Sequence, residues 1–174
     1  MDRSESLSKD SANAIRFRSM QMGDIPAICE IEQEAFTTPW TAGAFQNELT
    51  SNQFARYLVM EYDGQIAGYG GMWLIMEEAH ITNVAVRQQY RGKKLGERLM
   101  RELQKTASLY GAVRMTLEVR ASNYIAQNLY EKLGFYSVGV RRGYYTDNRE
   151  DAIIMWVDLP KFHQTSNQPT GEQP

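Results

Sequence analysis

Residues 84–96 decide the fold, and their sequence is Val84-Ala85-Val86-Arg87-Gln88-Gln89-Tyr90-Arg91-Gly92-Lys93-Lys94-Leu95-Gly96. A strand pattern ends in this stretch and a helical pattern follows it, so a basic turn containing glycine joins the two. A helix N-terminus offers unpaired N–H groups and a partial positive charge, and Gly96 has no side chain to keep an anion away from them. The stretch therefore predicts a phosphate-binding turn, although a basic turn before a helix is by itself more often a solvated connection.

The segments on either side predict a mixed α/β sheet. Apolar patterns indicate about seven strands, at residues 15–18, 55–62, 65–75, 79–86, 114–119, 135–142 and 152–158. Apolar residues at helical spacing indicate about four helices, at residues 25–36, 42–49, 96–110 and 123–133. We expect three of the helices to be capped at their N-termini, by Asp24, Thr41 and Ser122. Gly111 and Gly134 are expected to end two helices, and Asp63-Gly64 predicts a hairpin turn.

The chain is long enough for one domain with a core of its own. Its 174 residues need no disulfide or structural metal for stability. We expect the domain to span residues 15–160, between flexible polar tails at residues 1–14 and 161–174. The formal net charge is −2 and charged residues make up 23% of the chain, so no direct nucleic-acid binding is expected.

Cysteine and histidine usage favours a cytoplasmic protein without a metal. Cys29 is the single cysteine and lies among apolar residues, which favours a reducing compartment. Residues 1–13 lack the apolar core of a signal peptide, and no run of eighteen apolar residues occurs, so no membrane association is expected. His80 and His163 have no cysteine partners at ligand spacing, which argues against a metal site. We interpret His80 as a structural strand residue.

Two motifs resemble the GNAT superfamily of N-acetyltransferases. Residues 91–96, Arg-Gly-Lys-Lys-Leu-Gly, resemble its acetyl-CoA signature of Arg or Gln, two residues, Gly, one residue, then Gly or Ala, with Lys94 in place of the first glycine. Residues 117–123 (LEVRASN) and 129–135 (LYEKLGF) resemble the bacterial RimI-type branch. Pro39-Trp40 and residues 141–145 and 149–155 also resemble that branch, with departures at Gly143 and Thr146. The resemblance covers residues 15–159.

The resemblance implies a GNAT fold, in which the central strands splay around acetyl-CoA. Backbone groups of Asn83, Val84, Ala85 and Val86 would pair with the pantetheine arm like an added strand. The pyrophosphate would be held by Arg91, Gly92, Lys93, Lys94, Leu95 and Gly96. Asn123 and Tyr130 would contact the rest of the cofactor, and no metal is implied.

The resemblance also implies the catalytic pair. Glu118 would be the general base, acting through water, and Tyr130 the general acid near the thioester sulfur. From the pattern alone, Glu118 is a strand carboxylate facing solvent, on the face opposite to Leu117 and Val119. Tyr130 has apolar neighbours at helical spacing and is equally consistent with a packed core aromatic.

The implied activity is transfer of an acetyl group to the N-terminal α-amine of a protein. The acceptor would be an N-terminal alanine of a small-subunit ribosomal protein, bound near Trp40, Arg142, Tyr144 and Tyr145. A lysine side chain or a small-molecule amine is the alternative acceptor, because acceptors vary widely on this fold. A cofactor-binding module without turnover is a second alternative, against which the presence of both Glu118 and Tyr130 argues.

Overall fold

The computed structural model describes residues 14–161, and it contains a single seven-stranded mixed sheet. The strand order is β1-β2-β3-β4-β5-β7-β6. The strands are β1 (Ile15–Ser19), β2 (Ala55–Tyr62), β3 (Gln65–Ile75), β4 (Glu78–Val86), β5 (Arg114–Arg120), β6 (Tyr136–Arg141) and β7 (Ala152–Asp158). The tails expected at the two ends lie, apart from residues 14 and 161, outside the described residues.

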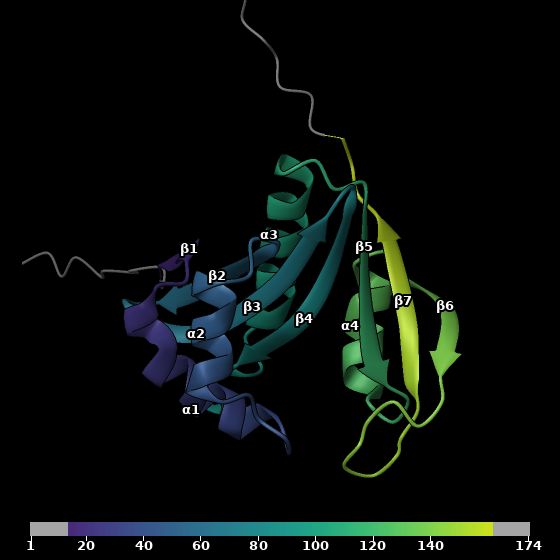
Figure 1. Ribbon diagram of the computed structural model, residues 1–174, viewed down its shortest axis with the longest axis horizontal. Helices are drawn as coiled ribbons and strands as arrows, with labels where there is room; N and C mark the ends of the chain where they lie inside the picture. The colour runs from purple at the N-terminus through teal and green to yellow at the C-terminus, as the bar shows by residue number, and fades with distance from the viewer. Residues whose placement is uncertain (1–13, 162–174) are drawn as a thin grey trace, which may run out of the picture.

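Four α-helices cover the two faces of this sheet (Figure 1). They are α1 (Ile25–Ala35), α2 (Ala42–Thr50), α3 (Leu95–Leu109) and α4 (Tyr124–Lys132), with short 3₁₀ turns η1 (Met22–Asp24) and η2 (Gln88–Tyr90). Helices α1 and α2 lie on one face of the sheet, and α3 and α4 lie on the other. Four helices on a mixed seven-stranded sheet confirm the predicted fold class.

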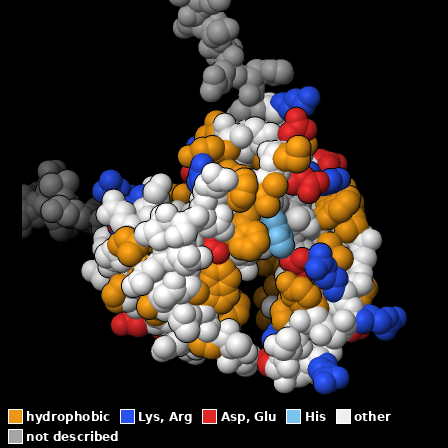
Figure 2. All heavy atoms as spheres, viewed as in Figure 1, with side chains coloured by type: hydrophobic (Ala, Val, Ile, Leu, Met, Phe, Trp, Pro, Cys, Tyr) orange, Lys and Arg blue, Asp and Glu red, His pale blue; other side chains and the backbone are white. Residues whose placement is uncertain are grey.

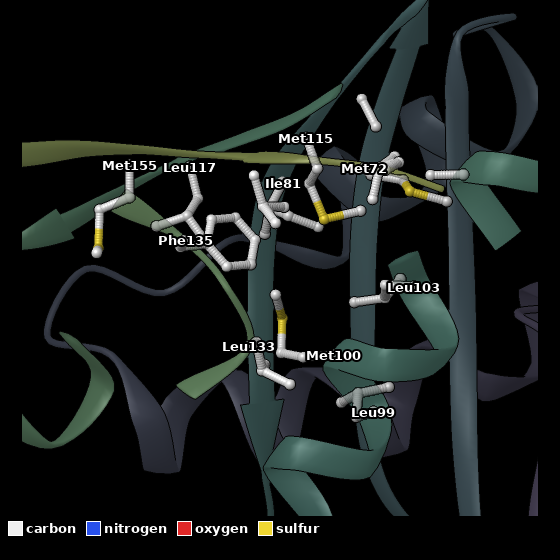
Figure 3. Packing of buried hydrophobic residues seen from close by; sticks show 14 of the residues in the cluster. Met72, Ile81, Leu99, Met100, Leu103, Met115, Leu117, Leu133, Phe135 and Met155 are labelled. Atoms are coloured by element: carbon white, nitrogen blue, oxygen red, sulfur yellow. The ribbon is translucent and has the colours of Figure 1, made fainter. Parts of the chain in front are cut away.

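Each face of the sheet has its own hydrophobic core. The core under α3 and α4 is the larger, and Figure 3 shows Leu99, Met100 and Leu103 of α3 packed toward the strands. The core under α1 and α2 is centred on Phe45, whose ring packs edge-on against two buried tyrosines. Because both faces are covered, the middle strands contribute side chains to two separate cores.

The sheet opens between its two middle strands. Strands β3 and β4 pair along almost their whole length, as do β5 and β7. The parallel ladder between β4 and β5 joins only residues 78–80 to residues 114–116. Beyond His80 and Thr116 the two strands diverge, and the sheet forms a V in Figure 1. Among the described residues, no strand pairs with residues 81–86 of β4 on the side that faces β5.

A β-bulge interrupts β4 where the opening begins. Gly71 pairs with Asn83, but Met72 pairs with Ile81, so Thr82 is the extra residue. An extra residue turns the following side chains to the opposite face of the sheet. Ile81 accordingly packs in the core under α3, whereas Ala85 packs in the core under α1 and α2. The bulge thereby also turns Asn83 toward α1.

The predicted helix caps are only partly correct. Thr41 caps α2 as expected, because its hydroxyl accepts from the Ala44 N–H at 3.2 Å. Asp24 stands at the N-cap of α1 without capping it, since its carboxylate binds Arg18 and the Gln21 N–H instead. Helix α4 is capped by Asn123 rather than by Ser122, and Asn123 Oδ1 accepts from the Ala126 N–H at 3.1 Å. Gly111 and Gly134 follow their helices at positive φ, as predicted.

Candidate active site

The opening between β4 and β5 is the centre of the candidate site. Figure 2 shows this face of the molecule hollowed between its two halves, with hydrophobic side chains on one wall and charged side chains at the opposite rim. The backbone of Asn83, Val84, Ala85 and Val86 lies along the side of β4 that faces the opening. Unpaired backbone N–H and C=O groups on a strand edge can bind an extended amide-containing chain. The edge therefore fits the pantetheine arm of acetyl-CoA, which carries two amides.

The turn before α3 has the backbone conformation that a glycine would favour. Lys94 is the N-cap residue of α3, with φ 59° and ψ 24°, which is left-handed, and Gly92 has φ 81°. A non-glycine residue in this region costs roughly 1–2 kcal/mol. The glycine of the family signature is thus explained by the backbone, and Lys94 takes the same shape at an energetic cost.

Gly96 lies in the first turn of α3 and leaves space beside the helix. A Cβ placed there would come no closer than 3.8 Å to Leu129 and 4.0 Å to Val86. The core therefore does not require a glycine at this position. An anion approaching the unpaired N–H groups of the first turn would require it.

The basic side chains of the turn differ in what they contact. Arg91 Nε lies 3.4 Å from the Val86 carbonyl, and Lys93 Nζ lies 5.8 Å from the centre of the Tyr62 ring. Leu95 is buried in the core, so only its backbone can reach an anion. The turn thus presents backbone donors first and side-chain charges around them, an arrangement that suits a pyrophosphate.

Glu118 lies at the opening and is held by a histidine and an arginine. Its Oε2 is 2.7 Å from His80 Nε2, its Oε1 is 3.8 Å from Arg141 Nη2, and its side chain is 9% exposed. Burial raises the pKa of the Glu118 carboxyl, but the hydrogen bond and charge of His80 and the charge of Arg141 outweigh it and leave the pKa below its usual range. Glu118 is therefore a carboxylate at neutral pH, able to accept a proton or a hydrogen bond.

Tyr130 lies on α4, on the face of the sheet that α3 also covers. It belongs to α4 and packs against the core under α3, with its ring 5.6 Å from that of Phe135. Burial raises the pKa of the Tyr130 phenol to about 12. Asn123 precedes Tyr130 by seven residues, two helical turns, and so shares its side of α4. The phenol keeps its proton at neutral pH and can act only as a donor of that proton or of a hydrogen bond.

Two of the predicted acceptor residues, Tyr144 and Tyr145, lie near Glu118. Burial raises the pKa of Tyr145 to about 12, and Glu118 and Tyr130 are both near enough to contribute to that rise. Burial and the Glu118 charge likewise raise the pKa of Tyr144, whose ring packs edge-on against Tyr145 at 5.1 Å. Tyr145 is therefore close to both Glu118 and Tyr130.

The structure does not bring Arg142 to the same place. Its side chain is 89% exposed, and its guanidinium lies 3.9 Å from Asp151. The neighbouring Arg141 faces Glu118 instead, and also lies 5.7 Å from the ring of Tyr144. Of this adjacent pair, Arg141 is the one that contacts Glu118.

Trp40 belongs to a loop that closes one end of the opening. This α1–α2 loop (residues 36–41) is joined to the β6–β7 loop (residues 142–151) by a 2.7 Å hydrogen bond from Thr37 Oγ1 to Asp147 Oδ2. Arg120, at the end of β5, binds Asp147 at 2.8 Å and stacks over Tyr145. Trp40 itself packs against Phe45 at 5.5 Å, so its ring belongs to the wall of the opening rather than to the catalytic pair.

Sequence reasoning missed three residues that the structure places at the site. His80 and Arg141 bind Glu118, and Glu32 of α1 lies buried beneath the α1–α2 loop. The sequence placed His80 in a strand with alternating apolar residues. It did not show that His80 faces Glu118, because that contact depends on how β4 and β5 pair. No group of three or more metal-binding side chains occurs within residues 14–161, and no helix there is long and apolar enough to cross a membrane.

These features define the class of protein. A splayed mixed sheet, a basic helix N-terminus at its opening and a buried carboxylate near it are the features expected of an acetyl-CoA-dependent acyltransferase. The model of the acetyltransferase (GNAT) family matches residues 25–135. The chain belongs to this family and is an acetyl-transferring enzyme.

Individual relatives place it more closely within the family. A Bacillus subtilis (strain 168) protein, a candidate ribosomal protein bS18-alanine N-acetyltransferase, is 49% identical over 142 residues, covering 82% of this chain and 94% of that protein. The ribosomal protein bS18-alanine N-acetyltransferase of Escherichia coli (strain K12) is 40% identical over 145 residues, covering 81% and 95%. The crystal structure of the ribosomal-protein-S18-alanine N-acetyltransferase from Escherichia coli matches with a TM-score of 0.78 and 33% identity, covering 87% of this chain and 98% of that one.

Proposed function

We propose that this enzyme transfers the acetyl group of acetyl-CoA to the N-terminal α-amine of ribosomal protein bS18, at an N-terminal alanine. The observation that carries the proposal is the Glu118 carboxylate, held by His80 at 2.7 Å at the diverging end of β5 beside Tyr145. The named activity of the relatives supports the same acceptor. The reaction would take place in the cytoplasm, and the acceptor would be a protein rather than a nucleic acid.

The cofactor would lie across the opening. Backbone groups of residues 83–86 would pair with the pantetheine, and the N-terminus of α3 with its turn, residues 91–96, would bind the pyrophosphate. Asn123 uses its side-chain oxygen to cap α4, which leaves its amide NH₂ to donate to the cofactor arm. The bound cofactor would supply an acetyl thioester at the level of Glu118 and Tyr130.

Glu118 and Tyr130 would manage the two protons of the reaction. As the new C–N bond forms, Glu118 would accept one amine proton through a water molecule, because its lowered pKa keeps it a carboxylate. As the C–S bond breaks, Tyr130 would donate a proton to the leaving sulfur and later recover one from solvent. Glu118 would release its proton to solvent, so the products are an N-acetylated protein and free CoA, and atoms and charge balance.

Selectivity for an α-amine follows from the weakness of this base. An N-terminal amine has a pKa of about 7.7 to 8.0, so roughly a quarter is already neutral near pH 7.4. A lysine at about 10.4 needs a further ~3 to 4 kcal/mol to lose its proton. The contacts of Glu118 with His80 and Arg141 lower the pKa of its carboxyl and therefore lower its basicity rather than raise it.

The test compares two peptides of one sequence at matched concentration and pH. One has a free N-terminal alanine, and the other is blocked at its N-terminus and carries one internal lysine. Mass spectrometry after incubation with acetyl-CoA should find acetylation of the free peptide at least about a hundredfold faster, since 3 kcal/mol corresponds to roughly that ratio. Comparable acetylation of the blocked peptide would exclude selectivity for N-termini and establish a lysine acetyltransferase instead.

A further inference from the structure

A chain of buried hydrogen bonds runs from β2 to α1, directly behind the opening. Tyr57 of β2 contacts Thr82 Oγ1 at 3.1 Å, and Thr82 donates to Asn83 Oδ1 at 2.8 Å. Asn83 Nδ2 donates to the Tyr69 hydroxyl at 3.2 Å, and that hydroxyl donates to Glu32 Oε2. Thr82 is the extra residue of the β4 bulge and Asn83 follows it, so these hydrogen bonds hold the bulge and the residue after it by their side chains.

Glu32 also holds the other side of the site. Its second oxygen, Oε1, accepts from the backbone N–H of Trp40 at 3.1 Å. One carboxyl group of α1 thus binds the α1–α2 loop with one oxygen and the bulge, through Tyr69 and Asn83, with the other. Glu32 is 2% exposed and no cation is bound to it among the described residues, so hydrogen bonds alone compensate for its burial.

The hydrogen bonds in this series all donate in the same direction. Asn83 uses its amide N–H on Tyr69, so the Tyr69 proton must point to Glu32. Thr82 uses its proton on Asn83, so Tyr57 must donate to Thr82. Every proton in the chain therefore points toward Glu32, and the arrangement requires a carboxylate with two accepting oxygens at its end.

The position of the bulge matters for the reaction. It lies where β4 leaves β5, with Thr82 two residues beyond His80 of the last ladder pair, and its backbone groups begin the edge that faces the opening. We propose that Glu32 is a positioning residue for acetyl transfer. Its carboxylate holds the β4 bulge, and with it the proposed cofactor-binding edge, in a fixed position relative to the loop that carries Trp40. This inference rests on the proposed use of residues 83–86 by the cofactor.

The charge state of Glu32 then controls the site. Burial raises the pKa of Glu32 to about 7, against the lowering effect of the hydrogen bonds from the Trp40 N–H and Asn83. Protonation would turn one acceptor into a donor that faces another donor. The titratable groups near Glu32 are Cys29 of α1, Tyr69 of β3 and Tyr57 of β2, the last also facing Glu48 of α2. Burial raises the pKa of both Cys29 and Tyr57, so neither ionises between pH 6 and 8.

The decisive variant is Glu32→Gln, because an amide cannot accept with both of its heavy atoms. The matched control is Glu48→Gln. Glu48 is also a buried acid on the same face, but only its Oε2 accepts, from Trp73 at 3.0 Å and from Asn52 at 2.9 Å. A glutamine carbonyl can replace that single oxygen. Tyr69→Phe is the second test variant, since it cuts the chain but leaves the Glu32 bond to Trp40.

Acetyl-CoA affinity would be measured by calorimetry at pH 8 and at pH 6. The kcat would be measured with a peptide that begins with alanine. We expect Glu32→Gln and Tyr69→Phe to weaken acetyl-CoA binding at pH 8 by about fivefold and to lower kcat by about tenfold, effects of the size expected for one or two buried hydrogen bonds. The wild type should lose affinity from pH 8 to pH 6 more steeply than Glu32→Gln. Glu48→Gln should stay within about twofold of the wild type.

The proposal fails if Glu32→Gln binds acetyl-CoA and turns over like the wild type with the same pH dependence, or if Glu48→Gln loses as much. Should Glu32→Gln not fold, Tyr69→Phe decides by the same measurements. A wild type that binds acetyl-CoA but does not acetylate the peptide would contradict the proposed acceptor. The binding measurements would then still decide the role of Glu32.

Discussion

The proposed cofactor side and the proposed acceptor side of the opening, called the cofactor side and the acceptor side below, are built in different ways. The cofactor side consists of one strand edge and one helix N-terminus, both within residues 83–96. The acceptor side is assembled from side chains far apart in the sequence: Thr37 binds Asp147, and Arg120 binds Asp147 and stacks on Tyr145. A cofactor shared by a whole family can be bound by backbone groups that the fold itself supplies. An acceptor that differs between members is bound by loop side chains, which can change without changing the fold.

The largest effect is expected where the two sides meet. Tyr130→Phe keeps the ring in its core position and removes the proton donor, so kcat should fall by roughly 10² or more while the fold is retained. Tyr124→Phe is the control, because Tyr124 lies on the same helix but is 70% exposed. Stopped assays of CoA release at saturating substrates measure both. Turnover of Tyr130→Phe near the wild-type value would reduce Tyr130 to a packing residue.

A change confined to the cofactor side should leave the acceptor side untouched. Gly96→Val places a side chain where phosphate oxygens would approach the first turn of α3, and the Kd of acetyl-CoA should rise about tenfold, the loss of about one charge-assisted hydrogen bond. The KM of the peptide should not change. Thermal unfolding of Gly96→Ala serves as the stability control, because a Cβ there meets Leu129 only at 3.8 Å. Unaltered acetyl-CoA affinity in a folded Gly96→Val would refute the pyrophosphate assignment.

The converse change should affect only the acceptor side. Thr37→Val removes the hydrogen bond between the α1–α2 and β6–β7 loops, so the KM of the peptide should rise about threefold with the Kd of acetyl-CoA constant. Thr38→Val is the neighbouring control, since the Thr38 hydroxyl has no hydrogen-bond partner within residues 14–161. If both variants shift both constants together, the two sides are not separable and the comparison is wrong.

The smallest effect concerns stability rather than catalysis. Lys94→Gly relieves the left-handed backbone at φ 59° and should raise the free energy of unfolding by about 1 kcal/mol. Lys93→Gly is the control, because Lys93 is not at positive φ and should gain nothing. Urea unfolding at pH 7.5 distinguishes them. A Lys94→Gly variant no more stable than Lys93→Gly would show that the turn carries no strain.

The fold was largely predictable because its signals are local. The Asp63-Gly64 hairpin, the helix of residues 96–110 and the strand of residues 152–158 each follow from neighbouring residues, and the structure has them within one residue of the expected bounds. The cap of α4 was less certain, because Ser122 and Asn123 are adjacent and both suit an N-cap. Local chemistry alone does not choose between them.

The site was less predictable because its contacts depend on register. A shift in the pairing of β6 with β7 lies between Ser137 and Gly139, and such a shift decides which of Arg141 and Arg142 faces Glu118. His80 meets Glu118 only through the short parallel ladder of β4 and β5, which no sequence pattern specifies. The catalytic and cofactor assignments remain predictions until the variants above are measured.

The shortness of that ladder gives the sheet four edges instead of two. Besides the outer edges of β1 and β6, the facing sides of β4 and β5 are edges too, and exposed strand edges invite pairing with other chains. These inner edges face each other inside a V that narrows to three residue pairs. A whole foreign strand with neighbours of its own does not fit between them, whereas a single thin, extended, amide-bearing molecule does. The same geometry that would admit the proposed cofactor thus protects the protein from aggregation at these inner strand edges.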